Sequence, residues 1–115
     1  MGQSRTMIKT NLNTCYKTAN YFNKMFFEIP RKHINFILVD IPEWGNFCED
    51  NGDVWIEMGK TYPNYNLFKN VLVHELVHMY QWLYPDPTDK SDHGPSFFKW
   101  NKQLTDYGVV LEETY

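Results

Sequence analysis

The sequence has little of what marks zinc ribbons, membrane proteins or general binders of nucleic acid. Its two cysteines, Cys15 and Cys48, lie far apart, and neither belongs to a C-x-x-C pair. This excludes a zinc ribbon and a thioredoxin-type redox motif. We expect two free thiols in a reducing cytoplasm, although their number leaves a disulfide between them open.

Long apolar runs and an excess of positive charge are also missing. No run reaches the length of a membrane span, and no charged segment is followed by the apolar core of a secretory signal. We therefore expect a cytoplasmic protein without membrane contact. The formal net charge is −3, which does not favour general DNA binding but leaves a local basic patch open.

What is present is the composition of an ordinary globular domain. Hydrophobic residues make up 43% and charged residues 22% of the chain, so it can bury a core. Aromatic residues reach 17%, which indicates a core of large side chains; platforms that stack on single-stranded nucleic acid are the alternative. No repeat or linker divides residues 1–115, and we expect one domain that acts as a monomer.

The first 58 residues predict a helix followed by a small antiparallel sheet. Residues 6–28 carry apolar side chains at steps of three and four, typical of an amphipathic helix that packs on a sheet. Residues 34–41 form a β-rich run. Asn51-Gly52, between residues 45–50 and 53–58, is a strong hairpin signal. These elements predict about three antiparallel strands.

The second half predicts two more helices, which makes the fold α+β. Apolar residues across 67–84 indicate a long helix, capped by Asn64 or Asn66. After a polar loop, a last helix starts near Pro95 and ends at Gly108. We expect the remaining residues to form a short strand or a docked extension.

The long helix contains an H-E-x-x-H pattern made by His74, Glu75 and His78. Residues four apart lie on one face of a helix, so both imidazoles can point at one metal ion. Glu75 can reach a water molecule on that ion without being a ligand. Because the flanks are apolar, these polar side chains are costly to bury unless a metal satisfies them. The alternative is two surface histidines that happen to lie four apart.

A third ligand has to come from downstream. Glu112 and Glu113 lie in the tail, which is a poor platform for a rigid ligand. His93 is the better candidate, because it follows a loop long enough to double back and precedes Gly94-Pro95, which fixes its backbone. Three histidines and a water form a known catalytic zinc set. A histidine that merely starts a helix, without metal, is the alternative.

The sequence resembles the SprT-like zinc metallopeptidases, the group that includes the Spartan proteases. The resemblance rests on H-E-L-V-H at residues 74–78, followed after a loop by H-G-P-S-F at residues 93–97, and it covers most of the chain. It implies a zincin-like minimal metallopeptidase core with Glu75 as the catalytic acid/base. The implied ligands of the Zn²⁺ ion are His74, His78 and His93.

The resemblance implies a zinc-dependent endopeptidase that hydrolyses peptide bonds by metal-activated water, with Glu75 as general base. The substrate would be a protein or an extended peptide, lying antiparallel to the strand at residues 54–58 if that strand is the sheet edge. Many relatives carry a zinc ribbon or basic DNA-binding segments; neither is present here, so action on DNA-associated proteins stays open. The alternatives are a zinc-binding but catalytically silent interaction module and a hydrolase of another substrate, such as an RNase.

Several other side chains are candidates by residue type alone. Three aspartates of the polar loop would hold ligand N–H groups or simply be solvated. We expect His33 to be an ordinary surface residue. Three tyrosines are candidates for a second oxyanion donor, although packing is the usual role of such residues. These aspartates and tyrosines are Asp86, Asp89, Asp92, Tyr80, Tyr84 and Tyr107.

Overall fold

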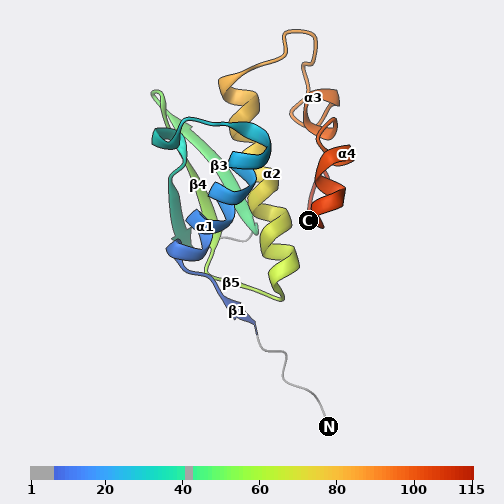
Figure 1. Cartoon of the computed structure of the whole chain (residues 1–115). Helices are drawn as coiled ribbons and strands as arrows, with labels where there is room; N and C mark the ends of the chain where they lie inside the picture. The colour runs from blue at the N-terminus through green and yellow to red at the C-terminus, as the bar shows by residue number, and fades with distance from the viewer. Residues whose placement is uncertain (1–6, 41–42) are drawn as a thin grey trace.

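The computed structural model describes residues 7–40 and 43–115 as an α+β fold (Figure 1). The long helix α2 lies between the strands and the C-terminal helices α3 and α4 in Figure 1. The elements are β1 (Ile8–Lys9), α1 (Leu12–Phe22), a π-helical turn (Asn23–Phe27), a 3-10 turn (Arg31–His33), β2 (Phe36–Val39), β3 (Gly45–Asp50), β4 (Asp53–Gly59), β5 (Thr61–Tyr62), α2 (Tyr65–Leu83), α3 (Pro95–Phe98), α4 (Asn101–Leu104) and a 3-10 turn (Thr105–Tyr107).

The main sheet has the strand order β2-β4-β3 and is mixed. The expected hairpin is confirmed, since β3 pairs antiparallel with β4 and Asn51 and Gly52 both have positive φ at its turn. The expectation of a purely antiparallel sheet is wrong, because β2 runs parallel to β4. The last expected residue of that first strand, Ile41, lies outside the described residues.

The central place of β4 removes the condition on which a peptide was expected to lie along residues 54–58, namely that this strand forms the sheet edge. Val54, Ile56 and Met58 are buried on one face of β4, and a strand of this kind is most stable with neighbours on both sides. The residues of β3 are half-buried or exposed, which suits an edge. Among the described strands, β3 is therefore the edge next to α2.

The N-terminal helix starts later than expected and ends in a π-helical turn. Ile8–Lys9 pairs with Thr61–Tyr62 as a short two-stranded sheet, so the helix begins only after the cap at Asn11, whose side chain accepts from the Thr14 amide at 2.8 Å. Residue 6, the expected start, lies outside the described residues.

The π-helical turn shifts the helical register by one residue. As a result Phe27 is buried, whereas Phe26, which the regular spacing placed in the stripe, is half-buried. The turn is held by Asn23, whose amide accepts from the Ile29 N–H at 2.6 Å and donates to the Ile29 carbonyl at 2.9 Å.

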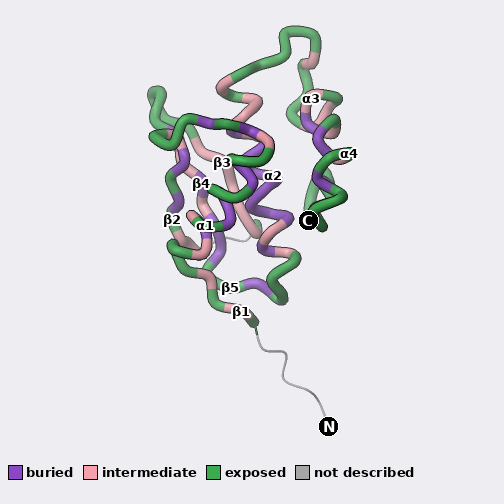
Figure 2. The backbone as a smooth tube through the Cα atoms, in the orientation of Figure 1, coloured by how far each residue is buried: buried purple, intermediate pink, exposed green. Residues whose placement is uncertain are grey.

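Helix α2 is the centre of the core. Asn64, one of the two expected caps, accepts from the Leu67 amide at 2.8 Å. The helix starts two residues before the predicted span of 67–84 and ends one residue before its end, at Leu83, ahead of Pro85. Residues 70–77 are all buried, which is visible as the purple stretch of α2 in Figure 2. Every face of this stretch is covered, because the sheet, α1 and the C-terminal segment pack around it.

The last predicted helix is broken into α3, α4 and a 3-10 turn, and it ends at Gly108 (φ 75°) as expected. Its predicted stripe, Phe97, Trp100 and Leu104, is buried. The tail forms no strand in the described chain but docks on the core, with Val109 and Leu111 buried. No helix of the described residues is long and apolar enough to cross a bilayer.

Candidate metal centre

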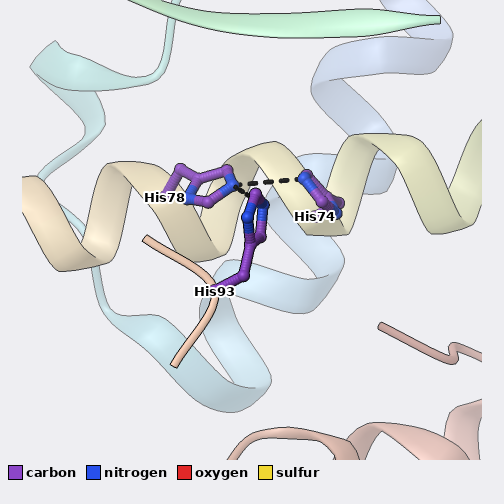
Figure 3. A group of neighbouring side chains, drawn as sticks. All are labelled: His74, His78 and His93. Atoms are coloured by element: carbon purple, nitrogen blue, oxygen red, sulfur yellow. Dashed lines mark hydrogen bonds between the residues drawn. The ribbon is translucent and has the colours of Figure 1, made fainter. Parts of the chain in front are cut away.

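Three imidazoles from two segments meet at one point. His74 and His78 lie one turn apart on α2, and His93 comes from the loop before α3 (Figure 3). The Nε2 atom of His78 is 3.1 Å from the Nε2 atoms of both His74 and His93. The loop that follows Pro85 therefore doubles back onto α2, as the position of His93 in the sequence suggested.

The donor set and its spacing fit a metal ion. One nitrogen from each of the three rings lies within 4.8 Å of the others. In a tetrahedral site with metal–nitrogen distances of about 2.0–2.1 Å, ligand nitrogens are about 3.3–3.4 Å apart, close to the two observed separations. The three histidines could therefore hold a metal ion after only a small outward adjustment.

The protonation of the two α2 histidines suits this role. Burial, together with the charges of His78 and His93, lowers the pKa of His74 to about 3. The Glu112 carbonyl opposes this shift, but its contact is not a full hydrogen bond, and among the described residues His74 Nδ1 has none. Burial also lowers the pKa of His78. Both rings are neutral at pH 7, as metal ligands must be.

Glu75 lies beside the histidines with its carboxylate almost fully buried. Its Oε2 atom is 4.0 Å from His74 Nε2, and only 6% of the residue is exposed. Burial raises the pKa of this carboxyl group to about 7, although the Phe47 backbone amide acts in the opposite direction. A carboxyl group with this pKa can both accept and return a proton near neutral pH.

Two cavities open beside the carboxylate. One has a volume of about 270 Å³ and the other about 470 Å³. His74 and Glu75 line both of them, and so do Gly45 at the start of β3 and Glu113 in the tail. The edge strand β3 thus forms one wall of the cleft, and the tail crosses it.

The sequence model of the SprT-like family matches residues 6–114. The chain belongs to the SprT-like family. No curated protein matches the chain significantly. The three histidines and Glu75 that this SprT-like chain brings together are the residues that the motif spacing selected.

The tyrosines that sequence reasoning selected do not line either cavity of the SprT-like chain. Tyr80 packs on Phe27 and Trp100, and Tyr107 packs on Phe26. Tyr115, which was not among the candidates, lines the smaller cavity, with its ring centroid 5.4 Å from that of His74. The only feature of the sequence prediction that pointed to this position was the expectation that the tail docks on the domain.

Tyr115 is held by its own tail. Its hydroxyl donates to the Val110 carbonyl at 2.7 Å, and burial raises its pKa to about 12. The phenol is therefore neutral at physiological pH and forms part of the wall of the smaller cavity.

The loop aspartates of the SprT-like chain have separate structural roles. Asp86 accepts from the Thr88 amide at 2.9 Å, and Asp89 accepts from the Ser96 amide at 2.7 Å. Asp92 lines the larger cavity. His33 was expected at the surface; it is half-buried, with its ring 6.1 Å from that of Trp82, and it is not one of the three clustered histidines.

Proposed function

We propose that the protein is a zinc-dependent endopeptidase with His74, His78 and His93 as the zinc ligands and Glu75 as general base and acid. The observation that carries this proposal is the meeting of three imidazoles next to a buried carboxylate, 4.0 Å from the nearest ring nitrogen. Zinc binding alone does not require a carboxylate there. This argues against the alternative of a catalytically silent zinc-binding module.

The chemistry divides between the ion and the chain. When bound, zinc would act as a Lewis acid that polarises a substrate carbonyl and lowers the pKa of a water ligand. Glu75 would accept a proton from the attacking water and give it to the departing amine. Its buried position beside the three imidazoles places the carboxylate within reach of such a water. Burial of the carboxylate keeps bulk water away from it and holds it beside the reacting atoms.

An extended peptide would lie along β3, which replaces β4 in this role. Strand β3 is an edge of the described sheet, and its residues Gly45, Asn46 and Phe47 line the larger cavity. A free strand edge can pair with the backbone of an added peptide, so affinity does not require one particular sequence. This placement brings the peptide backbone past Glu75.

The charge of the cleft favours a polypeptide over a nucleic acid. Glu43, Asp92 and Glu113 line the cavities in addition to Glu75. No Lys or Arg of the described chain lines either of them. A phosphate backbone would be repelled there, so any DNA contact would have to lie outside the cleft.

The test compares wild-type protein with Glu75→Gln. We expect each to bind one zinc ion, measured by elemental analysis, while hydrolysis of an unfolded protein substrate falls about 10²–10⁴-fold in the variant. Glu28→Gln, at an exposed glutamate after the π-helical turn, is the matched control and should cleave normally. Assays with and without single-stranded DNA test for activation.

Two results would refute the proposal. Unchanged hydrolysis by Glu75→Gln would show that Glu75 is not the general base. A wild-type protein that binds zinc but cleaves no substrate under either condition would be the silent module instead.

A further inference from the structure

Gln81 connects the two segments that supply the histidines. It lies on α2, three residues after His78, and its Oε1 atom is 2.8 Å from His78 Nδ1. Its amide nitrogen donates to the Asp92 carbonyl at 3.1 Å and to the Ser96 hydroxyl at 3.0 Å. One side chain therefore reaches a histidine on α2 and both flanks of His93.

The direction of these hydrogen bonds can be deduced. A backbone carbonyl only accepts, so the group of Gln81 that faces the Asp92 carbonyl must be the NH₂ group. The Oε1 atom of Gln81 then faces His78, and because this oxygen only accepts, His78 Nδ1 must carry the proton. In a neutral ring this leaves Nε2 unprotonated. That is the atom 3.1 Å from the other two imidazoles.

The loop around His93 is held in place by its own hydrogen bonds. Asp89 accepts from the backbone amides of Ser96 at 2.7 Å and Ser91 at 3.1 Å, which ties the two sides of His93 together. A side chain at position 94 would collide with this carboxylate, so Gly94 is required for the close approach. Gln81 thus hydrogen-bonds to a loop that Asp89 already stabilises, and it fixes this loop to α2.

We propose that Gln81 is a positioning residue that sets two metal ligands at once. It fixes the tautomer of His78, and it holds His93 within reach of α2. The inference rests on the proposed metal site and deepens it, because the usual motif residues do not explain how a ligand from a loop is kept in register with ligands from a helix. Mutation of a residue that hydrogen-bonds to a metal ligand commonly lowers metal affinity by about 10–100-fold.

The first test is zinc affinity in Gln81→Met, measured by competition with a chromophoric chelator. Methionine keeps the length of the side chain but neither accepts from His78 nor donates to the loop in the same way. We expect affinity to fall about 10–100-fold. Gln103→Met, at an exposed position on α4, is the matched control and should bind as wild type does. Equal affinity in Gln81→Met would overturn the proposal.

The second test reads the tautomer directly in the zinc-free protein at pH 8. The ¹⁵N chemical shifts of His78 should report a proton on Nδ1 in the wild type. Gln81→Glu should keep that tautomer, because a carboxylate still accepts, but should bind zinc more weakly, because it cannot donate to the Asp92 carbonyl. Gln81→Met should lose the tautomer preference. A His78 ring protonated on Nε2 in the wild type, or unchanged in Gln81→Met, would overturn the assignment.

The two proposals fail in different ways. Zinc affinity and the tautomer are measured without hydrolysis. A protein that binds zinc, responds to Gln81→Met and cleaves no peptide would refute the endopeptidase while supporting Gln81. A wild-type protein that binds no zinc would overturn both.

Discussion

At the scale of single residues, the site concentrates groups whose burial opposes their charge. His74 and Glu75 are adjacent in the chain and are both buried, with 7% and 6% of each residue exposed. Burial moves their pKa values in opposite directions, to about 3 for the imidazole and about 7 for the carboxyl group. Both shifts favour the neutral form of the side chain.

The Glu75 shift predicts a pH-dependent cost for the zinc-free protein. A folded-state pKa of about 7, above the ordinary 4.5, gives stability that is present below pH 4.5 and lost as the pH rises through 7. A glutamine side chain at this position would mimic the protonated acid. Relative to wild type, Glu75→Gln should therefore gain stability over that window, reaching on the order of 3 kcal/mol at pH 8.

Urea unfolding at pH 4.5, 6 and 8 with a chelator present measures this difference. The variant and the wild type should be nearly equally stable at pH 4.5 and diverge above it. A stability difference that does not change with pH would mean that Glu75 titrates normally in the folded protein.

The sequence was most informative for residues whose relation is local. The spacing of His74, Glu75 and His78 follows from the helical period, and the structure brings these residues together with His93 as expected. Gln81 and Tyr115 were missed because their partners are set by packing between distant segments. Gln81 lies only three residues after His78, but its hydrogen bonds to the loop around His93 cannot be predicted until the path of that loop is known.

At the scale of elements, the two largest differences from the sequence prediction have non-local causes. Strand β4 takes the centre of the sheet because it buries the most apolar surface, with Ile56 and Met58 fully buried. Strand β2 therefore pairs with β4 rather than with β3, the next strand in the chain, and this pairing is parallel. The late start of α1 depends on the pairing of β1 with β5, more than fifty residues away. By contrast, the Asn51-Gly52 turn and the cap of α2 depend on local chemistry. The turn was predicted correctly, and Asn64 was one of the two predicted caps.

The π-helical turn predicts a strong effect for Asn23. Its side chain satisfies both the N–H and the carbonyl of Ile29, and Asn23 is buried. Asn23→Ala would leave two buried backbone groups unpaired, so we expect the free energy of unfolding to fall by about 2–4 kcal/mol. Asn20→Ala, at an exposed position of α1, is the control and should change stability by less than about 0.5 kcal/mol. Equal urea midpoints for the two variants would show that the turn does not depend on Asn23.

At the scale of the whole molecule, the metal-ligand candidates join two parts of the chain. His74 and His78 belong to α2, which packs against the sheet and α1. His93 belongs to the C-terminal segment, residues 85–115. That segment is attached to the rest of the chain by buried side chains of α3 and α4 and by Asn70 of α2, which accepts from the Val110 amide at 2.7 Å. Asn101 acts within the segment, where it accepts from the Leu111 amide at 2.6 Å.

This division predicts where zinc stabilises the molecule. A ligand that binds only the folded state adds RT ln(1 + [L]/Kd), or about 2.7 kcal/mol when its concentration is 100 times Kd. The gain should be greatest where binding joins segments that can open separately. Hydrogen exchange measured with and without a chelator should therefore slow most around residues 85–98 on zinc binding. The hydrogen-exchange rates of strands β2 and β4, which contribute no ligand candidates, should change least on zinc binding at low denaturant.

The control is His93→Ala, which keeps the two α2 histidines but removes the ligand from the C-terminal segment. In this variant zinc should protect residues 85–98 little, even at concentrations that occupy the remaining pair. Uniform protection of the wild-type chain would show that the segment opens only when the whole protein unfolds. Protection confined to α2 would place the ion on two histidines, and it would refute the convergence of the two parts of the chain on one ion.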